Sequence, residues 1–154
     1  MITVGFTGSR PQKLGGFILP NPIYNYVCQQ TEKLLLELKP DKCISGLALG
    51  FDQYAAFICT KLKIPYIAAI PFKNQDAVWS DPQKKIYKSL LSKSYQQVIV
   101  SEGDYAAYKM QLRNQYIVDN SDIMIACYDG KPGGTNNCVN YAKSKNKQII
   151  YITI

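Results

Sequence analysis

The sequence contains no histidine, and its five cysteines form no Cys-x-x-Cys pair. Without histidine, the chain has no histidine-based zinc site, no histidine general base and no Ser-His-Asp or Cys-His catalytic arrangement. Four of the cysteines lie in apolar runs, where cysteine acts as a small buried hydrophobe. An odd number of cysteines without a leader sequence favours a reducing, intracellular setting. We therefore expect no metal site, no cofactor and free thiols.

Acidic residues and long apolar runs are also scarce. The chain has 18 Lys and Arg against 11 Asp and Glu, a formal net charge of +7, which favours anionic partners. The cations are spread out, without the block of like charges that is typical of a nucleic-acid-binding arm. No apolar run approaches the roughly 20 residues that span a bilayer, and the N-terminus lacks the pattern of a signal peptide. We expect a cytoplasmic protein without membrane contact.

Short apolar runs alternate with helical periodicity along the chain. The pattern predicts strands at residues 2–6, 43–44, 66–70, 97–100, 123–127 and 148–152. It predicts helices at residues 24–38, 51–62, 86–91, 105–116 and 136–145, the third after a start signal at Ser80. At 154 residues the chain is expected to form one domain, 1–154. This order favours an α/β, Rossmann-like three-layer sandwich with a mainly parallel sheet of about six strands.

In such sheets ligands bind outside the carboxyl ends of the strands. After the first strand, Gly8 and Ser9 allow close backbone approach, and Arg10 offers a forked cation for phosphate. The alternative is a tight turn with an exposed arginine. After the second strand, Gly46 and Gly50 bracket a turn.

Asp52 follows that turn, near the start of the second helix. One interpretation is a carboxylate that is stabilised there by capping and the helix dipole. The other is a carboxylate that holds a ribose hydroxyl or orients Arg10.

The fifth strand leads into a glycine-rich turn and the start of a helix. Gly133 and Gly134 remove Cβ atoms from the approach path, and Thr135 and Asn136 are candidates to cap the next helix. A helix N-terminus presents free N–H groups and about half a positive charge, which favours anions. The turn therefore predicts a phosphate site, with Asp129 beside it, although a plain strand-to-helix connection is the alternative.

Two further features allow two interpretations each. Lys109 and Arg113 are four residues apart on one helical face, so either solvent screens them or an anion lies between them. The tyrosines of that helix fall on a stripe typical of a core face. Trp79 either stacks on a base or packs against the protein.

At these loops the sequence resembles the SLOG superfamily, a Rossmann-like group that includes DprA/Smf and the LOG phosphoribohydrolases, and most closely its YpsA-like branch. The resemblance covers nearly the whole chain and rests on four motifs, Thr7-Gly8-Ser9-Arg10-Pro11-Gln12-Lys13-Leu14, Ser45-Gly46-Leu47-Ala48-Leu49-Gly50-Phe51-Asp52, Leu112-Arg113-Asn114-Gln115-Tyr116-Ile117-Val118-Asp119 and Tyr128-Asp129-Gly130-Lys131-Pro132-Gly133-Gly134-Thr135. It implies a nucleotide or nucleotide-derived ligand and a homo-oligomer.

The resemblance bears on catalysis as well. LOG enzymes cleave the N-glycosidic bond of nucleoside monophosphates and carry an arginine where this chain has Arg113. They also place a glutamate just after the glycine turn, whereas Asn136, Asn137 and Cys138 follow the turn here. Glycosidic cleavage needs a group that stabilises an oxocarbenium-like state or activates water. The absence of a carboxylate at this position favours a binding protein, and the sequence selects none of Asp52, Glu102, Asp104 and Asp129 as a substitute.

Three hypotheses follow. The first is a binder of a nucleotide or nucleotide-derived molecule that acts as sensor, carrier or sequestering protein, with a phage or defence setting as one interpretation. The second is a LOG-type phosphoribohydrolase, with Arg113 as the one catalytic candidate. The third is a single-stranded nucleic-acid binder. The predicted ligand-binding residues are Gly8, Ser9, Arg10, Gly46, Gly50, Asp52, Trp79, Arg113, Asn114, Asp129, Gly133, Gly134, Thr135 and Asn136.

Overall fold

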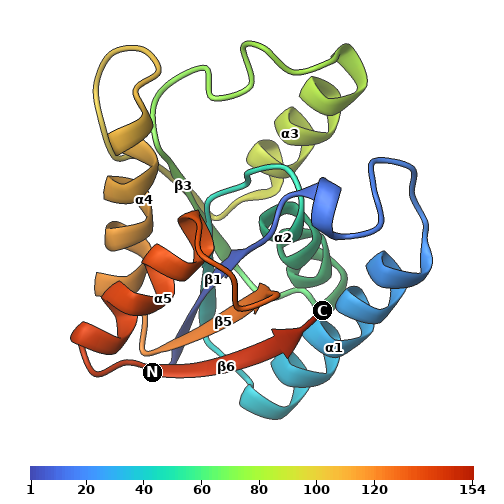
Figure 1. The fold of residues 1–154 in the computed structure, drawn as a ribbon, viewed down its shortest axis with the longest axis vertical. Coiled ribbons are helices and arrows are strands. Elements are labelled where there is room, and N and C mark those ends of the chain that lie inside the picture. The colour runs from blue at the N-terminus through green and yellow to red at the C-terminus, as the bar shows by residue number, and fades with distance from the viewer.

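The computed structural model describes residues 1–154 as an α/β domain around a six-stranded sheet (Figure 1). The strands are β1 (Thr3–Gly8), β2 (Lys42–Ser45), β3 (Tyr66–Ile70), β4 (Gln96–Ile99), β5 (Ile123–Tyr128) and β6 (Gln148–Thr153). The helices are α1 (Pro22–Leu38), α2 (Phe51–Leu62), α3 (Asp81–Lys93), α4 (Ala107–Asp119) and α5 (Gly134–Ser144), with a short 3-10 helix, η1 (Pro11–Lys13). All five strand pairs are parallel, which confirms the predicted fold class.

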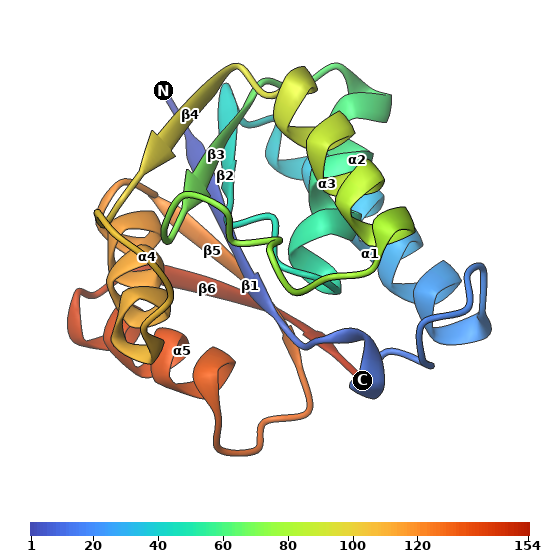
Figure 2. The same cartoon turned by 90° about the horizontal axis from the view of Figure 1, so that it is seen from above.

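The strand order is β4-β3-β2-β1-β5-β6. The chain therefore moves outward from β1 to β4 and then crosses back to place β5 on the other side of β1. Helices α1, α2 and α3 cover one face of the sheet, and α4 and α5 cover the other (Figure 2). The point where the strand order reverses lies between β1 and β5. Parallel α/β sheets open a crevice for ligands at the carboxyl ends of such a pair.

The sheet is buried on both faces, which explains why its central strands are apolar throughout. Alternate residues of β5 enter different cores: Ile125 packs under α1–α3, and Met124 packs under α4 and α5. Full burial of one such side chain stabilises the fold by about 1.5–3 kcal/mol. The two cores hold β1 and β5 rigidly and so fix the position of the loops that leave them.

Local signals set several helix boundaries. The Asn21 side chain accepts from the Tyr24 N–H and Pro22 opens α1, while Ser80 and Gln83 form a capping box at α3. Helix α5 begins at Gly134, two residues before its predicted start, with Gly133 at the N-cap. Neither Thr135 nor Asn136 caps it, because both already lie inside its first turn.

Helix α4 buries a different face from the one predicted. Tyr105, just before the helix, is 68% exposed and Tyr108 is 63% exposed, so the expected tyrosine core face is wrong for these two, while Tyr116 packs partly buried against the core. The buried residues of α4 are Lys109, Arg113, Ile117 and Val118. Both cations donate to backbone carbonyls inside the protein. Lys109 Nζ donates to the carbonyls of Glu102 and Asp104.

All five cysteines are free thiols; Cys28 is partly exposed and the other four are buried. No helix combines the length and the apolar character that crossing a membrane requires.

Candidate functional site

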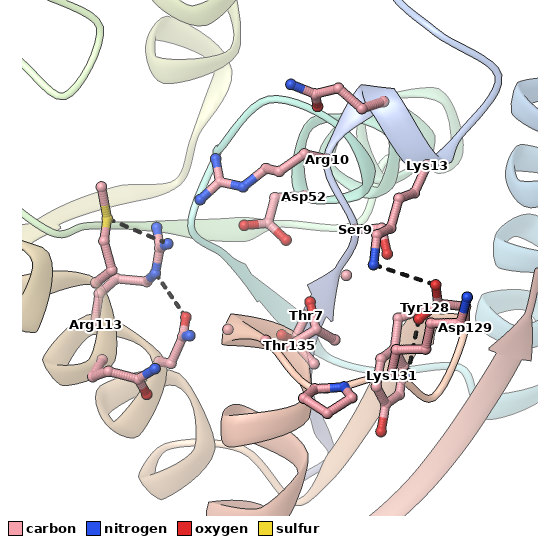
Figure 3. A pocket seen from close by; sticks show the side chains of 18 residues that line it. Thr7, Ser9, Arg10, Lys13, Asp52, Arg113, Tyr128, Asp129, Lys131 and Thr135 are labelled. Carbon is pink, nitrogen blue, oxygen red and sulfur yellow. Dashed lines mark hydrogen bonds and ion pairs between the residues drawn. The ribbon is translucent and has the colours of Figure 1, made fainter.

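A cavity of about 460 Å³ lies at the carboxyl ends of β1 and β5, at the reversal of strand order (Figure 3). Eighteen residues line it, and only two of them are hydrophobic. Ten of the predicted ligand-binding residues meet here: Gly8, Ser9, Arg10, Asp52, Arg113, Asn114, Asp129, Gly133, Gly134 and Thr135. The loops after β1 and β5, the start of α2 and the middle of α4 thus form one site.

Gly46 and Gly50 do not line the cavity, but both allow close contacts between the segments that form it. Gly50 has a φ of 101°, and a Cβ there would collide with the carbonyl oxygen of Ser9. That oxygen accepts from the Phe51 N–H at 3.1 Å, and the Ser9 N–H donates to Cys127 O at 2.9 Å. The turn after β1 is therefore fixed to α2 on one side and to β5 on the other.

Trp79 and Asn136 also lie outside the cavity. Trp79 packs edge-on against Tyr87, with ring centroids 5.2 Å apart, and contacts the core under α1–α3. The Trp79 ring thus packs against the protein and does not line the cavity. The Asn136 side chain accepts from the Tyr128 hydroxyl at 3.0 Å and so holds that ring at the cavity wall.

Arg113 is 2% exposed and forms one side of the cavity. Its Nη1 donates to the Gly46 carbonyl at 3.0 Å, and its Nε donates to Asn114 Oδ1 at 2.9 Å. A Cβ at position 46 would overlap the guanidinium group, which explains the glycine there. Burial lowers the pKa of Arg113, and the nearby Asp52 carboxyl opposes this.

Asp52 lies opposite, in the first turn of α2, and is 8% exposed. Its Oδ1 is buried without a hydrogen-bond partner. Burial raises the pKa of Asp52, opposed by Arg113, Arg10 and the Ala48 N–H. A buried acceptor without a donor costs about 1–3 kcal/mol, which a ligand hydroxyl or N–H recovers when it binds. Strongly perturbed carboxyls in clefts are characteristic of functional sites.

The raised pKa of Asp52 predicts a pH dependence of stability. Because the folded protein holds the proton of Asp52 more tightly than the unfolded chain, the contribution of Asp52 to stability is greatest below pH 3.8, its ordinary pKa. It declines as the pH rises through the folded pKa. Asp52→Asn, which cannot ionise, is expected to gain melting temperature relative to wild type from acid to neutral pH. Parallel thermal melts between pH 3 and 8 measure this, and a difference independent of pH would contradict it.

Asp129 lies in a different setting, although it belongs to the same cavity. Its Oδ1 accepts from the Lys131 N–H at 2.9 Å, and its Oδ2 pairs with Lys13 Nζ at 3.3 Å. The Lys131 N–H and then the Lys13 ammonium lower the pKa of Asp129. The pair joins η1 to the β5–α5 turn, so Asp129 shapes the cavity wall while Asp52 keeps an acceptor free.

The β5–α5 turn presents the start of α5 to the cavity. The first hydrogen bond of α5 runs from the Asn137 N–H to Gly133 O, at 2.9 Å. The preceding N–H groups have no acceptor within the helix. A Cβ at Gly133 or Gly134 would meet no atom within 4 Å, so the space above the turn is open.

Sequence reasoning omitted eight lining residues from the ligand set: Thr7, Gln12, Lys13, Met110, Gln111, Tyr128, Lys131 and Pro132. Most of them lie inside the motifs that carry the SLOG resemblance, so the motifs themselves were a usable signal. Met110 and Gln111 are near Arg113 on α4, and only the tertiary structure places them. Glu102 and Asp104, which were candidates for a catalytic carboxylate, are exposed outside the cavity.

The fold and the cavity define a Rossmann-like domain with a polar, cation-lined ligand site. The chain belongs to the SLOG family, because the YpsA model described as YspA SLOG family matches residues 4–154. It is also 40% identical over 128 residues to the SPbeta prophage-derived protein YoqJ of Bacillus subtilis (strain 168), which covers 73% of this chain and 75% of that protein.

Two solved structures share the fold. The first is DNA processing protein A of Helicobacter pylori, a protein that binds single-stranded DNA. It aligns with a TM-score of 0.70 and 22% identity, over 97% of this chain. This chain spans 64% of that protein's length. The molybdenum cofactor binding protein of Rippkaea orientalis aligns with a TM-score of 0.66 and 21% identity, over 99% of this chain and 77% of that one.

Proposed function

We propose that this protein binds a nucleotide or nucleotide-derived small molecule in the cavity between β1 and β5. One observation carries the proposal: the open N-terminus of α5, two arginines and a buried carboxylate oxygen without a partner converge on one cavity of about 460 Å³. The volume lies within the range of about 300–1,000 Å³ that is typical of small-molecule sites. The mostly polar lining suits a ligand that carries phosphate and hydroxyl groups.

The phosphate and the ribose of such a ligand bind to different walls of the cavity. Its phosphate binds the free N–H groups of Gly134 and Thr135, with the Arg10 guanidinium as a forked partner. Its ribose lies toward Asp52, whose Oδ1 accepts from a sugar hydroxyl. Arg113 balances the charge of that carboxylate across the cavity. The site thus recognises an anion joined to a hydroxyl-bearing group rather than phosphate alone.

We propose a sequestering, carrier or sensor role for this binding. The relative in a Bacillus prophage supports a phage setting, in which trapping a host nucleotide is a useful activity. The structural neighbour that binds a molybdenum cofactor supports a carrier role on the same fold. The glycine turn lacks a following carboxylate, which argues against a LOG-type reaction at that position.

A specific observation favours a phosphoribohydrolase as the second candidate. Of the four carboxylates considered from the sequence, only Asp52 lies in the cavity with a free acceptor oxygen. A carboxyl with a raised pKa is what glycoside cleavage uses as general acid, and an ionised one stabilises an oxocarbenium-like transition state. In such a reaction Asp52 would be the carboxyl that acts on the glycosidic bond, and Arg113 would balance the charge of its ionised form.

Titration of four nucleoside monophosphates (AMP, GMP, CMP and UMP) into the protein, followed by chromatography of the mixture, separates the two candidates. We expect micromolar binding of at least one nucleotide, as heat in a calorimeter, and no release of free base over hours. Base release that is lost in Asp52→Asn would establish the hydrolase instead. Absence of binding to all four nucleotides and to ribose 5-phosphate would contradict the proposal itself.

Single-stranded nucleic acid fits the geometry less well. The exposed Tyr105 and Tyr108 offer stacking surfaces, and the H. pylori neighbour binds single-stranded DNA. However, both cations of α4, Lys109 and Arg113, are buried and bound to backbone carbonyls. The helix therefore presents no exposed positive charge beside these tyrosines, and binding to a nucleic-acid backbone depends on such charge.

A further inference from the structure

A second, smaller cavity adjoins the polar one. It has a volume of about 180 Å³ and is lined by Arg10, Pro11, Gln12, Phe17 and Leu49. Arg10 and Gln12 also line the larger cavity, so the two share a wall. The smaller cavity is below the range of a complete ligand site and suits one part of a ligand.

The chemistry of this second cavity complements the first. The larger cavity is rich in charge, and Tyr128 is its single aromatic residue. The smaller one has a phenylalanine, a proline and a leucine as apolar surfaces, and the Gln12 amide as both a donor and an acceptor. Apolar faces beside an amide suit a planar heterocycle, which stacks on rings and bonds along its edge.

The position of Phe17 is set by the start of α1. Phe17 is 55% exposed, in the loop between η1 and α1. Asn21, the cap of α1, donates from Nδ2 to the Ile18 carbonyl at 3.1 Å, and a Cβ on Gly15 would collide with its side chain. The loop is therefore anchored to the helix, and Phe17 lines the smaller cavity together with Leu49 of the β2–α2 loop.

We propose that this smaller cavity, between Phe17 and Leu49, holds the nucleobase of the ligand whose phosphate and ribose bind in the larger cavity. The inference rests on the proposed function, because it assigns the remaining part of the same ligand. Arg10 lies between the two parts and contacts the ligand from both cavities.

The test compares ribose 5-phosphate with the nucleoside monophosphate that binds most tightly among AMP, GMP, CMP and UMP. Stacking on an aromatic side chain strengthens binding by about 5- to 150-fold per base. In wild type, calorimetry is expected to show the nucleotide binding more tightly than ribose 5-phosphate by a factor in that range. Phe17→Ala is expected to remove most of this advantage and to leave the affinity for ribose 5-phosphate unchanged.

Ile18→Ala is the matched control, because Ile18 is the next residue of the same loop, is 85% exposed and lines neither cavity. It is expected to change neither affinity. Leu49→Ala removes the opposite wall and is expected to reproduce the effect of Phe17→Ala. Thermal melts establish that each variant is folded.

The outcomes separate this inference from the proposed function. Binding of ribose 5-phosphate with a nucleotide advantage that survives in both Phe17→Ala and Leu49→Ala would overturn the base site alone. Loss of the advantage in Tyr128→Leu, with both of those variants unaffected, would place the base in the polar cavity and also overturn it. If neither ribose 5-phosphate nor any of the four nucleotides binds, the proposed function fails.

Discussion

Arg113→Ala is expected to lower the free energy of unfolding by about 3 kcal/mol, the lower end of the range for breaking a buried charge arrangement. The substitution removes a nearly fully buried guanidinium and leaves Asp52 without the strongest charge that opposes its burial. The Gly46 carbonyl keeps Gln75 Nε2 as a donor at 3.1 Å, which limits the loss at that atom. Urea denaturation followed by circular dichroism measures the change, with the m-value as a check on two-state unfolding.

The double variant isolates the reason for that loss. Adding Asp52→Asn to Arg113→Ala removes the uncompensated charge, so the double variant is expected to be more stable than Arg113→Ala by roughly 0.5–3 kcal/mol, the usual range for coupled neighbours. Gln115→Ala on the same helix is the control and is expected to stay within about 0.5 kcal/mol of wild type. A double variant no more stable than Arg113→Ala would show that lost packing, not charge, dominates.

Gly134→Val is expected to weaken ligand binding by about 100-fold while leaving the protein folded. A Cβ at this position meets no atom of the protein, and Gly134 has no left-handed backbone conformation that valine would strain. The added side chain projects instead into the open space where the phosphate approaches the α5 N-terminus. A loss of roughly 100-fold, about 2.7 kcal/mol, matches the removal of one or two charge-assisted hydrogen bonds. Calorimetric titration of the preferred nucleotide measures it.

Asn137→Val is the matched control, because it introduces the same side chain in the same helical turn. Asn137 is exposed and does not line the cavity. We expect it to bind the nucleotide like wild type and to melt cooperatively. If Gly134→Val is folded and binds with unchanged affinity, the phosphate does not lie on this turn.

The predicted elements agree with the structure to within about two residues at most boundaries, because local rules set them. Pro22, the Ser80–Gln83 capping box and the fully apolar β5 act within a few residues of chain. The same local rules did not predict which face of helix α4 is buried. The tyrosine pattern predicted a core face, but Tyr105 and Tyr108 are exposed. Lys109 is buried instead, because its Nζ donates to the carbonyls of Glu102 and Asp104.

The loops that form the cavity were predictable from sequence for a topological reason. Parallel strands deliver their carboxyl-end loops to one edge of the sheet, so the glycine-rich turns after β1 and β5 had to meet. The distinct roles of the carboxylates were not predictable. Asp52 and Asp129 both lie close to a glycine in motif segments, yet one keeps a buried free oxygen and the other is paired with Lys13.

The sequence by itself determined the family, the parallel α/β fold and the glycine turns that converge on one cavity. These follow from periodicity, from caps and from residues that are close along the chain. Only the tertiary structure decided which side chains face that site. Burial and partnering depend on contacts between residues far apart in sequence, such as Arg113 with Gly46 and Gln75 with Gly46. The tertiary packing leaves Asp52 Oδ1 without a hydrogen-bond partner and places Trp79 against the core.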